Sequence, residues 1–122
     1  ITAIFTPEQV KAITENLSQY TFAIVSVFAG RIADSGLDPM PIMRECVEIL
    51  KDSPKAELLW ASPRELLNII QADEVGCHII TATPSVLGKL KLLEKDLTEF
   101  SLETVQMFYD DAQAAGYTIN IA

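Results

Sequence analysis

The sequence is poor in basic residues, and this scarcity narrows the partners that the protein can bind. Nine Lys and Arg stand against 17 Asp and Glu in 122 residues, which leaves a formal net charge of −8. A charge of this sign repels nucleic-acid phosphates and anionic membrane surfaces at long range. We therefore expect neither nucleic acid nor membrane as a partner, and we expect any bound anion to be held by a local group of donors.

Long apolar runs, clustered metal ligands and glycine-rich phosphate motifs are also missing. The longest apolar stretches, such as residues 22–29, fall far short of the roughly 20 residues that a membrane-spanning helix needs. The start of the chain shows no signal-peptide pattern. A single His78 and two cysteines without CxxC spacing, Cys46 and Cys77, predict no metal site and buried thiols in a reducing cytoplasm. We expect a cytoplasmic protein without a cofactor.

The residues that are present suffice for a core and alternate between strand and helix patterns. Hydrophobic residues make up 49% of the chain, which predicts one folded domain over residues 1–122. Short β-branched runs at residues 1–5, 21–28, 57–61 and 78–82 predict strands, each followed by a segment of helical period. The second run is apolar on both faces, as in a parallel strand covered on both sides. A last helix is predicted over residues 101–115.

Four βα units predict an α/β fold with parallel strands, either an open sheet or half of an eight-unit barrel. Doubly wound sheets usually carry a ligand loop with glycine or acidic residues after their first strand, whereas this strand ends in Phe5-Thr6-Pro7. Half of a (β/α)8 TIM barrel, followed by a C-terminal helix, is the better fit.

A hydroxyl residue followed by proline marks the expected start of three helices. Thr6, Ser62 and Thr83 each precede a proline, and each is predicted to cap the helix that follows. Gln9 completes a capping box with Thr6. Another helix is predicted to open at Pro39 and to end near residue 51, and residues 29–38, with two glycines, are predicted to form a loop.

Two of the three arginines fall where predicted strands end, which is where ligands bind in parallel βα folds. Arg31 follows the second strand, and Arg64 lies in the first turn of a helix capped by Ser62. A cation there opposes the helix dipole unless a bound anion compensates it. Arg31, Ser62 and Arg64 therefore predict a phosphate site. The alternative is two surface arginines with local acidic partners: Asp34 for Arg31, and Glu65 or Glu57 for Arg64.

Lysine, by contrast, is absent from every predicted strand. The six lysines lie in polar helical or loop contexts, and none has the desolvated setting that a nucleophilic amine needs. His78 and Trp60 are interpreted as core or rim residues. Thr2 and Ser26 are polar residues within apolar strands, so they either bond to neighbouring backbone or point at a substrate from a barrel interior.

Four segments of the sequence, in order, resemble the transaldolase and fructose-6-phosphate aldolase family. They are ITAIFT at 1–6, SVFAGRIAD at 26–34, WASPR at 60–64 and GCHIIT at 76–81. The resemblance implies a TIM-barrel enzyme of carbohydrate metabolism, as in the pentose phosphate pathway, that breaks and forms carbon–carbon bonds of sugar phosphates through a lysine Schiff base. This chain would be the C-terminal half, with strands five to eight. The family's lysine would lie upstream of Ile1, which implies that this chain alone is inactive.

The resemblance also implies roles for individual residues. Thr2 is similar to the threonine that helps to hold the catalytic water. Ser26 and Phe28 resemble the family's substrate-contacting residues. The family's phosphate-binding residues have their counterparts in Arg31, Ser62 and Arg64. Val27 departs from the proline of many members. Transaldolase activity and fructose-6-phosphate aldolase activity both stay open, as does the acceptor aldose.

A second class of function is a non-catalytic module that binds phosphosugars or a partner and lacks the lysine. Half a barrel also leaves two apolar sheet edges unpaired. We expect a second copy of the chain, or the missing N-terminal half, to cover them.

Overall fold

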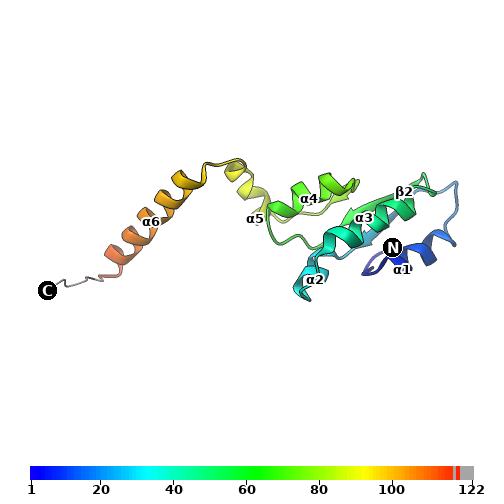
Figure 1. The fold of residues 1–122 in the computed structure, drawn as a ribbon, viewed down its shortest axis with the longest axis horizontal. Helices are drawn as coiled ribbons and strands as arrows, with labels where there is room; N and C mark the ends of the chain where they lie inside the picture. The colour runs from blue at the N-terminus through cyan, green and yellow to red at the C-terminus, as the bar shows by residue number, and fades with distance from the viewer. Residues whose placement is uncertain (117, 119–122) are drawn as a thin grey trace. The chain divides into compact units, whose positions relative to one another are not determined.

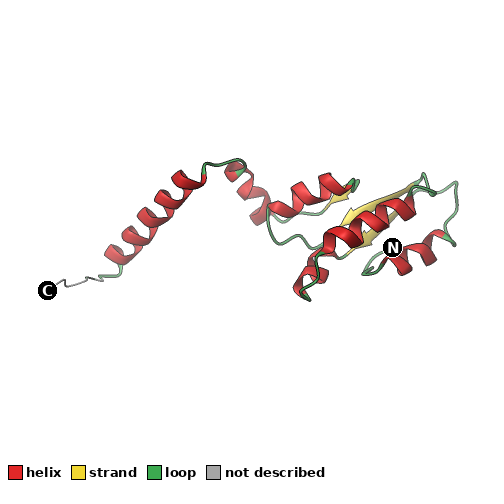
Figure 2. Cartoon of the chain, viewed as in Figure 1, coloured by secondary structure: helices red, strands yellow, loops and turns green. Residues whose placement is uncertain are grey.

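Three parallel strands form the sheet of this computed structural model, which describes residues 1–116 and 118. The strands are β1 (Ala23–Val27), β2 (Ala56–Trp60) and β3 (Ile79–Ile80), in the spatial order β1-β2-β3. Val27 pairs with Trp60, and Trp60 pairs with Ile80, so the carboxyl ends of the strands lie together. Figure 2 shows these strands among the helices that connect them. The α/β class with a parallel sheet is confirmed, and it is consistent with part of a TIM barrel.

Residues 1–5 lie beside β1 without forming the strand that the sequence predicted. A single parallel bridge joins Ile4 to Val27. Ser26 N donates to Ile1 O at 2.8 Å, and Phe28 N donates to Ile4 O at 2.9 Å. Ala3 between them has φ +61°, which is outside the extended region and interrupts regular pairing. The predicted set of four βα units is therefore reproduced only in part.

The predicted cap signals at two helices are confirmed. At α1 (Pro7–Thr14), Thr6 Oγ1 accepts from Gln9 N at 3.2 Å, and Gln9 Oε1 accepts from Thr6 N at 3.1 Å. At α5 (Pro84–Leu87), Thr83 Oγ1 accepts from Val86 N at 3.2 Å. This second helix is shorter than predicted, because the chain tightens into a 3₁₀ helix at Gly88–Leu92. Helix α3 (Pro39–Leu50) opens at Pro39 as predicted, with Asp38 as its cap.

The predicted loop over residues 29–38 is wrong, because α2 (Ala29–Asp34) occupies its first half. Gly30 suggested a turn, but it is buried inside this helix. A Cβ atom built on Gly30 would lie 1.5 Å from Ser62 O. The glycine is therefore explained by the close approach of another backbone segment and not by a turn.

The predicted cap at Ser62 is also wrong. Ser62 has φ +61°, and α4 (Leu67–Val75) begins five residues later. Asn68 Oδ1 accepts from Arg64 N at 2.8 Å and from Glu65 N at 3.0 Å, so an asparagine inside the helix holds the loop that precedes it. Arg64 consequently lies in this loop and not in the first turn of a helix.

The core lies on one face of the sheet. Val25 and Val27 of β1 and Leu58 and Trp60 of β2 are fully buried, together with Val10, Met43 and Cys46 from α1 and α3. Figure 1 shows α3 running along β2. On the other face Ile24 is 46% exposed, and Ser26, Glu57 and Leu59 are half-buried. The prediction that β1 is covered on both faces is therefore wrong within the described structure.

The chain divides into two units, Ile1–Leu90 and Lys91–Ala122, and the second contains α6 (Leu97–Ala114). Asp96 caps this helix by accepting from Glu99 N at 2.9 Å. The helix predicted over residues 101–115 thus falls within a longer helix, on which Leu102, Val105 and Phe108 are more than 60% exposed. No helix in the described ranges is long and apolar enough to cross a membrane.

Candidate functional site

The first turn of α2, which follows β1, meets the loop that follows β2 at the carboxyl end of the sheet. Ala61 N donates to Val27 O at 2.8 Å, and Gly30 N donates to Ala61 O at 3.2 Å. Because Gly30 has no side chain, the first turn of α2 can lie against the backbone of Ser62. These bonds fix residues 28–31 and 61–64 next to each other.

Arg64 crosses between these two segments to reach a carboxylate. Its Nη2 donates to Asp34 Oδ2 at 2.9 Å, although Asp34 is 30 residues earlier in the chain. This hydrogen bond, together with the positive charges of Arg64 and Arg31, lowers the pKa of Asp34 below its usual value. Burial raises this pKa, but its effect is smaller than that of the hydrogen bond. Asp34 in turn raises the pKa of Arg64. Two cations thus act on one carboxylate at the edge where the strands end.

The structure therefore gives Asp34 a different partner from the one that the surface-arginine alternative assigned. That alternative paired Asp34 with Arg31, and Arg64 with Glu65 or Glu57. Asp34 instead bonds to Arg64, and Arg31 lies with its Cζ 5.8 Å from the centroid of the Phe28 ring. Sequence reasoning missed that Asp34 joins α2 to the loop after β2, because its three-residue spacing from Arg31 indicated only a local pair.

The guanidinium of Arg31 lies over the ring of Phe28, which in turn packs against the ring of Phe5. Phe28 is half-buried, and its ring centroid lies 5.9 Å from that of Phe5. An apolar hollow of about 240 Å³ adjoins these groups, between the start of α1 and helices α2 and α3, and Phe5, Arg31, Ile32 and Leu37 are among its lining residues. A cation on an aromatic face keeps its outward donors available.

Thr2 and Ser26 lie on neighbouring segments of the sheet. Ser26 follows Val25 and precedes Val27, both of which are buried against the helices, so its side chain belongs to the uncovered face. Thr2 is exposed and stands between Ile1 and Ala3 in the segment that pairs with β1. The described structure thus places these two hydroxyl residues along the sheet and the arginines at its end.

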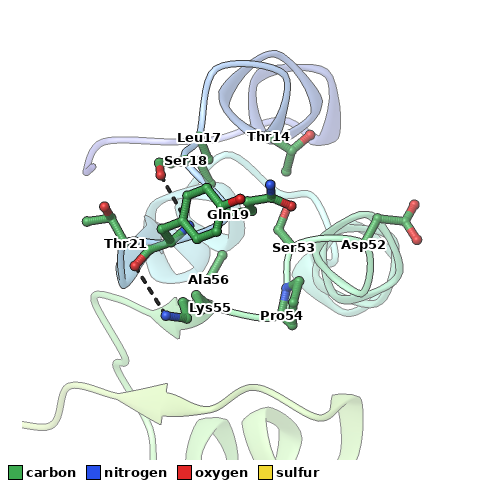
Figure 3. Close-up of a pocket in the computed structure, with 11 residues that line it drawn as sticks. Thr14, Leu17, Ser18, Gln19, Thr21, Asp52, Ser53, Pro54, Lys55 and Ala56 are labelled. Atoms are coloured by element: carbon green, nitrogen blue, oxygen red, sulfur yellow. Dashed lines mark hydrogen bonds between the residues drawn. The ribbon is translucent and has the colours of Figure 1, made fainter.

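Another cavity, of about 300 Å³, lies at the opposite ends of the strands (Figure 3). It is lined by Thr14 and residues 17–21, which precede β1, and by residues 52–56, which lead into the start of β2. Lys55 Nζ donates to Tyr20 O at 3.2 Å across it. Because ligands of parallel βα folds bind at the carboxyl ends of the strands, we assign this cavity no role in the chemistry.

The remaining chemically capable side chains have structural roles. His78 Nδ1 accepts from Leu58 N at 3.0 Å, at the start of β3. Burial raises the pKa of the free thiols of Cys46 and Cys77 to about 12, so both are protonated near neutral pH. No lysine lies on β1, β2 or β3. Across the part of the chain that the structure describes, no three His, Cys, Asp or Glu residues gather as metal ligands.

The parallel βα sheet is consistent with part of a TIM barrel, and comparison with known proteins identifies the family. The family model described as Transaldolase/Fructose-6-phosphate aldolase matches residues 1–119. The chain belongs to this family.

Curated relatives agree with this assignment. The chain is 31% identical to a probable transaldolase of Nitrosopumilus maritimus (strain SCM1), covering 99% of this chain and 53% of the relative. It is 30% identical to one of Thermoanaerobacter sp. (strain X514), covering 98% and 51%. A third, from Herpetosiphon aurantiacus, is 34% identical over 85% of this chain and 45% of its own length. The chain spans about half the length of the curated relatives that it matches.

Proposed function

We propose that this chain forms part of a transaldolase-like enzyme that acts on sugar phosphates, and that it provides the phosphate-binding side of the active site. The observation that carries the proposal is that Arg31 and Arg64 both follow strands at the carboxyl end of the sheet, where Arg64 bonds to Asp34. Family membership supports the reaction class, since the family description and the names of the relatives both refer to transaldolases.

The local charge at this end of the sheet fits a phosphate better than a neutral sugar. The protein as a whole carries a net charge of −8, so an anion gains nothing from its long-range field. Two guanidinium groups offer planar, paired donors that match phosphate oxygens, and each retains donors beyond those used within the protein. We assign the phosphate to Arg31 and Arg64, with Ser62 beside them.

The carbon–carbon chemistry is proposed to follow the Schiff-base route. A lysine amine would attack the ketose carbonyl with loss of water to form an iminium. A base would then take the proton of the hydroxyl on the fourth carbon as the bond between the third and fourth carbons breaks, the electron pair would pass to the iminium to give an enamine, and the aldehyde would leave. Phosphate contacts remote from that bond would fix the reacting carbons. Ser26, on the uncovered face, and Phe28 would contact the substrate, and Thr2 would help to hold the catalytic water.

The lysine is proposed to come from polypeptide other than residues 1–122. Each lysine here lies in a helix, a helix end or a loop, and Lys55 is already bonded to Tyr20 O. We therefore expect residues 1–122 alone to be inactive.

The absence of a lysine from the three strands also favours the second candidate, a phosphosugar-binding module without aldol chemistry. In either case we propose that a second copy or further barrel strands cover the two open sheet edges, which the particle mass from solution scattering would show.

Borohydride trapping separates the two candidates. The protein expressed from its complete gene is incubated with fructose 6-phosphate and sodium borohydride, and the modified peptide is mapped by mass spectrometry. The aldol enzyme predicts a reduced sugar adduct on a lysine outside residues 1–122. Binding of fructose 6-phosphate without any adduct would support the module, and an adduct on a lysine within residues 1–122 would contradict the proposed source of the amine.

A further inference from the structure

We infer that Asp34 is a positioning residue that holds Arg64 in the orientation needed to receive the phosphate of the substrate. The inference rests on the proposed function and adds to it a residue that does not itself touch the substrate. Asp34 ends α2, and Arg64 lies in the loop between β2 and α4. The bond between them therefore sets the β2–α4 loop relative to α2, which carries Arg31.

Both ends of this bond stand on a fixed backbone. Arg64 N donates to Asn68 Oδ1 at 2.8 Å, which holds the main chain of Arg64 to the first turn of α4. On the other side, Gly30 N donates to Ala61 O at 3.2 Å and holds α2 against the β2–α4 loop. With both backbones held, the Asp34 carboxylate restricts the side-chain torsions of Arg64. An arginine that is ordered before binding loses less entropy when the phosphate arrives.

The charge arrangement adds a second reason. Arg31 and Arg64 both act on Asp34, so the carboxylate offsets the repulsion between two cations that would otherwise face an empty site. Arg64 uses Nη2 for Asp34, and a guanidinium carries five N–H donors in a rigid plane. The remaining donors can bind a phosphate while the bond to Asp34 persists.

The opposing effect is direct repulsion between the carboxylate of Asp34 and the phosphate. If repulsion dominated, removing the charge of Asp34 would strengthen phosphate binding, whereas loss of positioning would weaken it. Both side chains are about half exposed, at 53% for Arg64 and 54% for Asp34, so solvent screens the charges, and the restraint on Arg64 comes from the direct bond at 2.9 Å between two held backbones. We therefore expect positioning to dominate.

The test compares Asp34→Asn with a matched control, Glu74→Gln. Glu74 pairs with Arg44 at 3.7 Å, with similar exposures of 55% for Arg44 and 63% for Glu74, on the outer helices α3 and α4. Both variants remove one negative charge from an exposed ion pair. Affinities for fructose 6-phosphate and for fructose are measured by calorimetry on the protein expressed from its complete gene, after the fold of each variant is verified by circular dichroism.

We expect Asp34→Asn to weaken fructose 6-phosphate binding roughly three- to fivefold, the upper part of the range for exposed ion-pair couplings, and to leave fructose binding unchanged. Glu74→Gln should change neither. Equal loss for both sugars would indicate a merely structural role and would overturn the inference, as would unchanged or tighter fructose 6-phosphate binding. If the unmodified protein shows no preference for the phosphorylated sugar, the proposed function fails first, and the inference fails with it.

A spectroscopic measurement tests the positioning itself. In the unmodified protein, the guanidinium of Arg64 should give a nitrogen resonance with slow rotation about its Nε–Cζ bond, because Nη2 is held by Asp34. Asp34→Asn should remove this slow rotation, and Asp34→Glu should restore part of it together with part of the phosphate preference. Rotation that is equally fast in the unmodified protein and in Asp34→Asn would overturn the inference.

Discussion

Gly30 determines how closely α2 can approach the loop between β2 and α4, the two segments that carry the arginines proposed to bind phosphate. Its position in a buried first turn, against the carbonyl oxygen of Ser62, leaves no volume for a methyl group. The obstructing atom belongs to the main chain, so no side-chain rotation can relieve the overlap. The site therefore depends on a residue that contributes no functional group.

Replacing Gly30 with Ala should destabilise the fold by at least about 2 kcal/mol, because the main chain of α2 or of Ser62 must move. Gly88→Ala is the matched control, since nothing lies within 4 Å of the Cβ that it would add, and its effect should stay within about 1 kcal/mol. Urea unfolding followed by the fluorescence of Trp60, the single and fully buried tryptophan, measures both variants. Equal stabilities would contradict the close contact.

The two arginines should matter for phosphorylated sugars alone. Arg31→Ala and Arg64→Ala are each expected to weaken binding of fructose 6-phosphate by about tenfold or more, because each removes charge-assisted hydrogen bonds, with little change for fructose. Arg44→Ala removes the same charge from the outer surface and should leave both affinities unchanged. Calorimetric titration with the two sugars gives the comparison. An equal loss for both sugars would refute the assignment.

Among the elements, α1 shows how much a local sequence signal can determine. The helix spans only eight residues, and isolated helices of this length are unstable in water. Its start is fixed by reciprocal bonds between Thr6 and Gln9, all of them between residues close in sequence. Short-range chemistry of this kind can be read from the amino-acid order.

Thr6→Ala should therefore lower the free energy of unfolding by about 1 kcal/mol, because it leaves the amide of Gln9 without its acceptor. Thr21→Ala is a suitable control, since Thr21 is exposed and caps none of the described helices. Thermal unfolding followed by circular dichroism compares the two. A loss of equal size in Thr21→Ala would show that the capping box has no special effect.

The same signal failed at Ser62, although Ser62, Pro63 and Glu65 have the spacing of a cap. The contact with Gly30 and the left-handed backbone of Ser62 delay the helix until Leu67. These are tertiary constraints between segments about 30 residues apart, and local sequence does not reveal them. The α/β class, the parallel strands and the arginines at strand ends were predictable, whereas α2, the start of α4 and the bond from Arg64 to Asp34 were not.

At the scale of the whole molecule, the first unit has a core on one side of its sheet only. Two cysteines lie on that side: Cys46 is fully buried in α3, and Cys77, before β3, packs partly against the core. Burial raises the pKa of both thiols from 9.0 to about 12. The folded chain therefore retains protons that the unfolded chain releases above about pH 9.

Stability should consequently decline as the pH rises from 9 toward 12, because ionised thiols favour the unfolded chain. The contribution is fully present below pH 9. Urea midpoints at pH 8 and pH 10 measure the decline. The double variant Cys46→Ala/Cys77→Ala lacks both thiols and should show a smaller decline, which is not zero because other groups still titrate in this pH range. Parallel declines in the two proteins would exclude the thiols as the cause.

The contact between Gly30 and the Ser62 carbonyl also has a genetic consequence. Every amino acid at position 62 brings the same main-chain oxygen, so a suppressor of Gly30→Ala at this position has to change the path of the backbone and not the size of the side chain. Revertants should instead restore glycine itself or alter the length of the β2–α4 loop. At position 30 the contact therefore requires glycine, whereas in the β2–α4 loop it requires a particular backbone path.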